Sequence, residues 1–193
     1  MKKIIGFSVL ILFILVSCSH KDKPEVTEEL KTALRSDTKT FMESLKSVLI
    51  KEIQTNGIVN AVSVCSDTAQ ILTNNYGVAK GIYIKRVSFK NRNPLNVPDD
   101  FESKVLKMFE EQFHKNQLKP ESEYVELIEQ NGVYKVKYMK PIFVQPECLN
   151  CHGTEEHISP QVKDLINKVY PNDKARGYQI GDLRGAVSIQ KTL

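Results

Sequence analysis

Two stretches near the beginning of the chain repeat apolar residues at intervals of three, four or seven, which places them on one face of a helix. The first runs from about Pro24 to Thr55 and carries Leu30, Leu34, Phe41, Leu45, Val48, Leu49 and Ile53. The second runs from about Val59 to Asn75 and carries Val62, Cys65, Ala69 and Leu72. We therefore expect two amphipathic helices, the first ending at Asn56-Gly57 and the second closed by Asn74, Asn75 and Gly77.

The pattern then changes to one that alternates strands and short helices. Strands are predicted at 81–90, 124–129, 133–144 and 185–190, a helix with an acidic first turn from Pro98, and a short helix at 160–170. Gln130-Asn131-Gly132 is a turn signal between the two central strands. This order predicts an α+β domain in which helices flank an antiparallel sheet.

The first residues indicate export from the cytoplasm. Lys2 and Lys3 precede an apolar run of 13 residues, Ile4 to Val16, which has the length of a signal-peptide core rather than of a membrane span. The run ends in Leu15-Val16-Ser17-Cys18, which resembles the lipobox of bacterial lipoproteins. The alternative is an ordinary signal peptide in which Cys18 has no special role.

We therefore divide the chain into a lipoprotein signal peptide (1–17), a lipid-anchored tether (18–23) and one domain (24–193). Acylated Cys18 would hold the protein at a membrane, facing the periplasm. Ser19, in place of an aspartate, is similar to the outer-membrane sorting signal of Gram-negative lipoproteins. The cell envelope, and the outer rather than the inner membrane, is thus the expected location.

The charge balance gives no support for a nucleic-acid partner. The formal net charge of the 193 residues is +4, and removal of Lys2 and Lys3 with the signal peptide leaves +2. Lysine and glutamate alternate along most of the chain, as on an ordinary solvated surface.

Cys148-Leu149-Asn150-Cys151-His152 is the attachment pattern of c-type haem. The two thiols form thioethers to the two vinyl groups on one edge of the porphyrin, and two intervening residues set their separation on a tight turn. The histidine that follows then lies beneath the iron and coordinates it. The motif predicts one covalent haem c, with Cys148 and Cys151 as the attachment residues and His152 as the proximal ligand.

Two other interpretations of the same residues remain open. Cys148 and Cys151 could form a redox-active disulfide, although such motifs require no histidine. Alternatively, Cys148, Cys151, His152 and His157 could bind zinc, although most zinc sites take a second ligand pair from farther along the chain.

The ligand on the other side of the iron has several candidates. They are Cys65, Met139, Met108, His114 and His157. His157 follows His152 too closely to reach the opposite haem face easily, whereas Met139 lies in a strand, and methionine is a common cytochrome ligand. If Cys18 carries lipid and the motif cysteines carry haem, Cys65 is the odd thiol. From the residues alone, a thiolate ligand and a buried structural cysteine remain equally open.

Several blocks of the sequence, in order, resemble a bacterial family of PAS-like domains of unknown function that carry one c-type haem. The blocks, which extend over about Lys31 to the C-terminus, are Val62–Ala69, Ile84–Ser88, Arg92–Asn96, Cys148–Gly153, Tyr170–Tyr178 and Gly181–Ala186. The resemblance implies a PAS-like antiparallel sheet with a long N-terminal helix and flanking helices. The family's histidine and cysteine axial ligands would correspond to His152 and Cys65, which favours Cys65 as the distal ligand.

Arginines near the expected pocket are candidates for pairing with the haem propionates. They are Arg86, Arg92, Arg176 and Arg184. The sequence does not choose among them, and each has a plain structural interpretation as well.

These features predict a haem-binding lipoprotein that acts as a redox or gas sensor and requires a signalling partner. The alternative is a periplasmic monohaem electron carrier with a redox partner. We do not expect an enzyme, because two axial ligands leave no open position on the iron and no convincing acid–base pair is present.

Overall fold

The computed structural model describes residues 23–193, except for the side chains of residues 64 and 65. The predicted signal peptide and Cys18 lie outside the described residues. In that described part of the chain, no helix is long and apolar enough to cross a membrane.

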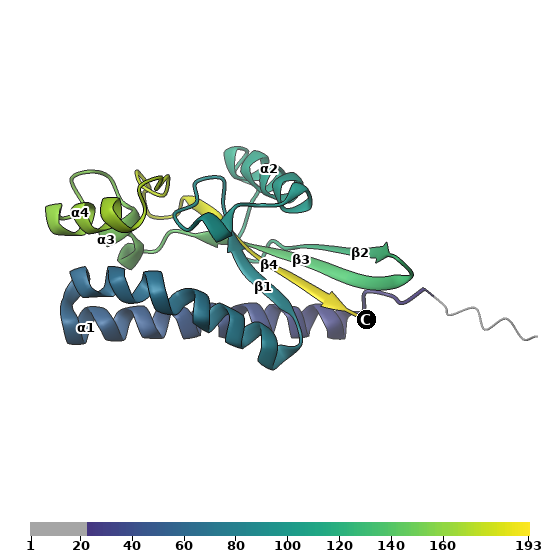
Figure 1. The fold of residues 1–193 in the computed structure, drawn as a ribbon. Coiled ribbons are helices and arrows are strands. Elements are labelled where there is room, and N and C mark those ends of the chain that lie inside the picture. The colour runs from purple at the N-terminus through teal and green to yellow at the C-terminus, as the bar shows by residue number, and fades with distance from the viewer. Residues whose placement is uncertain (1–22) are drawn as a thin grey trace, which may run out of the picture.

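The described chain forms one antiparallel sheet with helices on both faces (Figure 1). Its helices are α1 (Glu28–Lys80), α2 (Asp100–His114), α3 (Leu149–His152) and α4 (Pro160–Val169), with short 3-10 turns at Pro94–Asn96 and Pro146–Cys148. The strands are β1 (Tyr83–Val87), β2 (Tyr124–Gln130), β3 (Val133–Phe143) and β4 (Leu183–Thr192). They lie in the order β1-β4-β3-β2, and every neighbouring pair is antiparallel. The predicted α+β, PAS-like class is confirmed.

The α1 segment is a helical hairpin rather than one straight rod. Gly57 has φ 81° and ψ 167°, which interrupts the helix and turns the chain back on itself (Figure 1). A side chain rarely adopts this backbone conformation, so glycine is the residue that permits the turn. The hydroxyl of Thr27 accepts a hydrogen bond from the Leu30 backbone N–H and caps the beginning of α1. The two helices and the turn predicted at Asn56-Gly57 are therefore present.

The predicted end of the second helix was wrong by one and a half turns. The helix continues through Asn75 and Gly77 to Lys80, where Gly81 adopts a left-handed conformation with φ 62°. The Gly81 and Ile82 backbone N–H groups donate to the carbonyls of Val78 and Gly77. These bonds satisfy the last helical carbonyls, so the cap is at Gly81 and not at the earlier polar residues.

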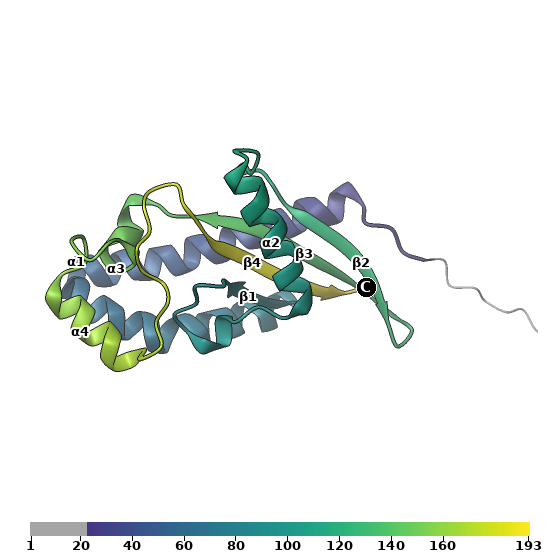
Figure 2. The same cartoon turned by 90° about the horizontal axis from the view of Figure 1, so that it is seen from above.

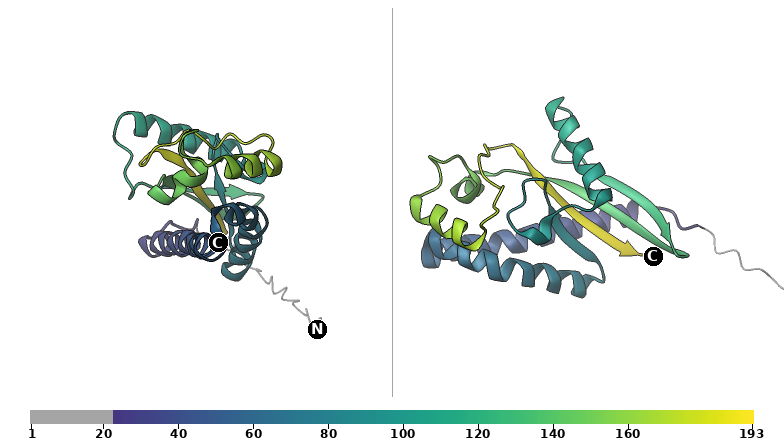
Figure 3. Two further views of the ribbon diagram at one scale, coloured as in Figure 1. Left: turned by 90° about the vertical axis from the view of Figure 1, so that its left-hand side faces the viewer. Right: turned by 45° about the horizontal axis from the view of Figure 1, so that its top comes forward.

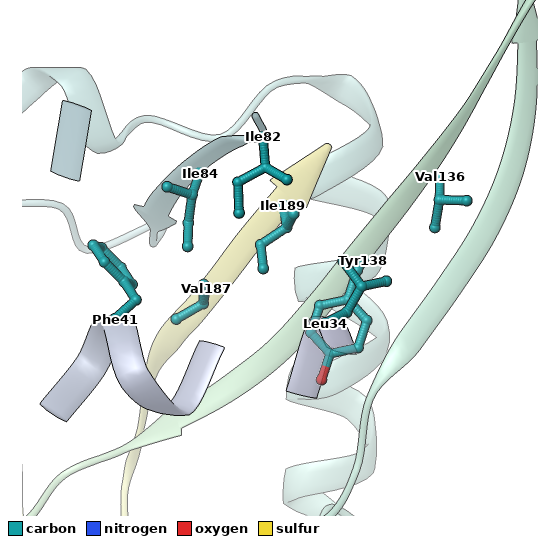
Figure 4. Packing of buried hydrophobic residues seen from close by; sticks show 8 residues of the cluster. All are labelled: Leu34, Phe41, Ile82, Ile84, Val136, Tyr138, Val187 and Ile189. Atoms are coloured by element: carbon teal, nitrogen blue, oxygen red, sulfur yellow. The ribbon is translucent and has the colours of Figure 1, made fainter. Parts of the chain in front are cut away.

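The two faces of the sheet pack against different helices. On one face, Leu34 and Phe41 of α1 contact apolar side chains of β1, β3 and β4 (Figure 4). On the other face, Val105, Leu106 and Phe109 of α2 form a second cluster. The end-on view in Figure 3 shows the two halves of α1 on one side of the sheet and α2 on the other. Because β4 is covered from both sides, its residues 185–189 are all buried.

A third, smaller cluster lies at one end of the molecule. Ile158, Val162 and Ile166 pack against Val62 of α1, near the Gly57 turn. This contact holds α4 and α3 at the end of the molecule opposite the β2–β3 turn and the first described residues (Figure 2).

A polar contact joins α1 to the beginning of the β2–β3 hairpin. The Arg35 guanidinium donates two hydrogen bonds to the Glu123 carboxylate, at 2.8 and 2.6 Å. The buried Tyr138 hydroxyl donates a third, at 3.1 Å. The bond from Arg35 is the main reason that the pKa of Glu123 lies below its ordinary value, and the Tyr138 hydroxyl acts in the same direction.

We predict that Glu123→Gln makes the protein less stable at neutral pH but not at strongly acidic pH. The pKa of Glu123 is depressed in the folded protein. Its contribution to the free energy of unfolding is therefore complete above the unfolded pKa of about 4.3 and is lost as the pH falls through the folded pKa. The urea midpoints of the wild type and the variant should differ at pH 7 and converge on acidification. Glu43→Gln, which alters an exposed pair with Lys39, is the control. A difference that does not change with pH would contradict this account.

Candidate functional site

The Cys148–His152 motif occupies a single tight turn. A 3-10 turn at Pro146–Cys148 leads directly into α3, Leu149–His152. Cys148 donates its backbone N–H to the Gln145 carbonyl, and its Sγ accepts the Gln145 N–H at 3.4 Å. Residues three or four positions apart on such a turn share one side, so the two cysteines and His152 are placed together.

The two thiols are partly buried and are not joined by a disulfide. Cys151 packs against the third cluster, which includes Val62 of α1. Burial raises the pKa of the Cys148 thiol, although the Gln145 N–H opposes this effect. The resting thiol of Cys148 is therefore protonated at neutral pH.

The His152 imidazole is held in one tautomer. Its Nδ1 lies 2.7 Å from the carbonyl oxygen of Ala175, and a carbonyl can only accept, so Nδ1 carries the proton. Burial, together with the charges of Arg184 and Arg92, depresses the pKa of His152 well below its ordinary range. The ring is therefore neutral, and its Nε2 keeps the lone pair that binds a metal.

The loop after α4 fixes the backbone of this turn. Gly177 donates its N–H to the Gly153 carbonyl at 2.8 Å, and Tyr178 donates to the His152 carbonyl at 3.0 Å. The Tyr178 ring also meets the His152 ring edge-on, with 6.4 Å between centroids. The end of α3 is thus held on two sides, by backbone bonds and by a ring contact.

Gly153 is required at the end of this turn because there is no room for a side chain. A Cβ at this position would lie 2.7 Å from the Leu149 carbonyl oxygen and 2.8 Å from the His157 Cβ. Its φ of −68° is open to any residue, so the requirement is one of space and not of backbone conformation.

Three of the candidate distal ligands lie on the α2 side of the sheet. Met139 is fully buried in the cluster under α2, and Met108 packs against the same cluster. His114 is exposed at the end of α2 and meets Phe113 edge-on. The contacts described for these three side chains are with that cluster and with α2, and none of them is with α3.

His157, also a candidate, lies beside the motif but points elsewhere. It is exposed, and its Nδ1 contacts the Thr154 hydroxyl at 2.9 Å. Within the described residues, no group of three or more His, Cys, Asp or Glu side chains is arranged to hold a metal ion. The donors of the zinc interpretation, Cys148, Cys151, His152 and His157, therefore do not converge.

Cys65 lies in the second half of α1, three residues after Val62. Its side chain lies outside the described part of the structure. The same half of α1 carries Val62, which belongs to the cluster that contacts Cys151.

The four candidate arginines have different surroundings. Arg92 and Arg176 both form ion pairs with Asp173. Arg86 lies in β1, in register with Val187. Arg184 donates to the Lys90 carbonyl at 3.0 Å and lies over the Tyr178 ring, 5.3 Å from its centroid. Among the described residues, no carboxylate lies within ion-pair distance of Arg184.

A cavity of about 610 Å³ lies between α1 and strands β3 and β4. Its apolar lining comes from Met42, Pro141, Ile142 and Val187, and its charged lining from Arg35, Lys39, Lys140 and Glu121. Met42 precedes Lys46 by about one helical turn, and Lys46 forms an ion pair with Glu147, next to Cys148. Through this pair, α1 contacts the segment that leads into the motif.

The groups that orient His152 could not be recognised from the sequence. The acceptor is a backbone carbonyl, and any residue could supply it. Asp173, which pairs with Arg92 and Arg176, lies in a segment whose residue types are typical of an ordinary turn. The Lys46–Glu147 pair was also missed, because the two residues are far apart in the sequence.

The residues present fit a c-type haem. Two thiols and an imidazole with a free Nε2 share one turn, and the structure holds the imidazole in the tautomer that a metal requires. Fold and site together define a PAS-like α+β domain with a Cys-X-X-Cys-His motif at the end of its sheet.

The chain belongs to the Tll0287-like family, whose model matches residues 24–191. This confirms the family expected from the sequence blocks. It is also similar to a solved structure, the cyanobacterial haem protein Tll0287, with a TM-score of 0.61 and 25% sequence identity. That match covers 88% of this chain and 96% of the other. No curated protein matches the chain.

We predict that Gly153→Ala destabilises the protein by about 1–3 kcal/mol, because the added methyl group meets a backbone carbonyl and a Cβ that cannot both move away. The urea midpoint at neutral pH measures the loss. Gln161→Ala, at an exposed position of α4, should change stability by less than about 0.5 kcal/mol. Equal stability of the Gly153 variant and the wild type would contradict the steric argument.

Proposed function

We propose that this protein is an exported lipoprotein that carries one covalent haem c on Cys148 and Cys151, with His152 as the proximal ligand. The observation that carries the proposal is the bond from His152 Nδ1–H to the Ala175 carbonyl, which leaves Nε2 available on the same turn as both thiols. A solved relative is described as a haem protein, which supports the assignment. A bound haem would supply a one-electron iron couple.

Cys65 is the proposed distal ligand. It belongs to the half of α1 that packs against Cys151 through Val62, whereas Met139, Met108 and His114 lie on the other side of the sheet. A thiolate is a strong donor, so this ligand would favour the ferric state and a low reduction potential.

Arg184 is the proposed partner of a haem propionate. Arg92 and Arg176 are already paired with Asp173, whereas Arg184, near His152, contacts the Lys90 carbonyl and Tyr178 and forms no ion pair within the described residues. A propionate carboxylate would supply Arg184 with a directly paired counter-charge.

The physiological role that we propose is redox or gas sensing. Ligation by both His152 and Cys65 leaves no open position for a substrate, which is the basis for proposing a protein without enzymatic activity. Release of the Cys65 thiolate upon reduction or gas binding would be the local change, and a partner protein would detect it. Electron transfer to an exported redox partner is the alternative.

The fold would present this site away from the membrane. Acylated Cys18 would place the beginning of α1 near the lipid surface, and α3 lies at the other end of the molecule (Figure 1). The first half of α1 alone spans roughly 40 Å, at 1.5 Å per residue. A periplasmic protein partner, rather than the lipid surface or a nucleic acid, is therefore the proposed reader of the haem.

We predict that Cys65→Ser retains covalent haem and loses the thiolate character of the ferric optical spectrum. Attachment depends on Cys148 and Cys151, whereas the spectrum reports the axial ligands. Met139→Leu is the control and should keep the wild-type spectrum, because Met139 is a core residue. An unchanged spectrum in Cys65→Ser would exclude Cys65 as the ligand.

Spectra recorded during reduction separate the two roles. The sensor predicts that ferrous protein loses the thiolate signature and binds carbon monoxide. Rapid, reversible reduction with unchanged ligation and no carbon monoxide binding would instead establish the electron carrier.

A further inference from the structure

The Asp173 carboxylate is the centre of a buried polar network behind His152. Its side chain is 2% exposed. It accepts hydrogen bonds from Arg92 Nε at 3.1 Å and Nη2 at 3.2 Å, from Arg176 Nε at 2.9 Å and from the Ala175 backbone N–H at 3.0 Å. Four donors thus fix the carboxylate, and the carboxylate in turn fixes the peptide group whose N–H belongs to Ala175.

Arg92 connects this carboxylate to the haem-attachment turn. The same Nη2 that contacts Asp173 donates to the Cys151 carbonyl at 2.6 Å and lies 3.4 Å from the Ala175 carbonyl. Its side chain is 13% exposed. One guanidinium therefore joins three segments that are distant in the sequence: the chain after β1, α3, and the loop after α4.

The Ala175 carbonyl is the acceptor of the His152 Nδ1–H bond, at 2.7 Å. We propose that Arg92 and Asp173 are positioning residues for His152: they hold the Ala175 carbonyl against Nδ1 and so set how strongly the imidazole donates to iron. This inference rests on the proposed haem site and adds the residues that regulate its proximal ligand.

The physical basis is the hydrogen bond on the far side of the ring. A strong bond from Nδ1–H to a carbonyl increases the basicity of Nε2, and a more basic ligand stabilises the ferric iron. Displacement of the carbonyl would weaken that bond. The reduction potential would then rise, and the Nδ1 proton would exchange more easily with water.

The test uses the mature haem-loaded protein with Arg92→Lys. Lysine keeps the positive charge but cannot contact Asp173 and the Cys151 carbonyl together through a planar fork. We expect a higher reduction potential and exchange of the His152 Nδ1 proton that is about tenfold faster by NMR, as follows from weakening one hydrogen bond. Wild-type values for both would overturn the proposal.

Arg92→Gln separates positioning from simple electrostatics. Removal of a positive charge near the haem stabilises the ferric state and lowers the potential if charge alone matters. Loss of the positioning of the Ala175 carbonyl instead raises the reduction potential. A higher potential with faster exchange supports the proposal, and a lower potential with wild-type exchange overturns it.

Glu102→Gln is the matched control, because it disrupts another buried ion pair, Lys85–Glu102 at 2.8 Å, on the α2 side of the protein. Its reduction potential and exchange rate should remain those of the wild type, and a change equal to that of Arg92→Lys would overturn the proposal.

If Arg92→Lys does not fold, Asp173→Asn replaces it, and the exchange of the His152 Nδ1 proton is measured in that variant. A wild-type protein without covalent haem refutes the proposed function itself. Covalent haem in the wild type, with the same reduction potential and exchange rate in the Arg92 variants, refutes only this inference.

Discussion

The hydrogen bond from His152 Nδ1–H to the Ala175 carbonyl is the interaction on which the site depends. It selects the tautomer of the imidazole, whose neutral state is due to burial and to the charges of Arg184 and Arg92, and it leaves Nε2 without the proton. Without it, the cysteines and the histidine would share a turn but the imidazole would lack the acceptor that fixes its orientation. The loop that supplies the carbonyl is itself tied to α3 by two backbone bonds and to Arg92 by Asp173.

The larger fold brings these segments together. The sheet is covered on one face by the α1 hairpin and on the other by α2, so β4, one of its two inner strands, is buried throughout its middle. At the end of the sheet where β3 leaves and β4 begins, α4 packs onto the turn of α1. The site is built there, between the ends of strands and not within the main core. Loops can then carry the chemistry while the sheet and α1 carry the stability.

Much of this arrangement could be predicted from local sequence. Periodicity found both halves of α1, α2 and the four strands, because apolar spacing directly reflects which face is buried. The Cys148–His152 motif could be recognised because its functional residues lie within five consecutive positions. The end of α1 at Lys80 was missed, since it is decided by the Gly81 cap and not by the polar residues before it. The roles of Asp173 and the Ala175 carbonyl were also beyond prediction, because they arise from contacts between distant segments.

The proposed function requires that one haem is covalently bound through Cys148 and Cys151. The most direct test is the pyridine haemochrome spectrum of the denatured polypeptide, exported in a host that matures c-type cytochromes, with Cys148→Ala/Cys151→Ala prepared in parallel. We expect a c-type haemochrome that remains with the wild-type chain and is absent from the double variant. A colourless wild-type chain, from a host shown to mature another c-type cytochrome, would contradict it, as would haem that stays with the double variant after denaturation.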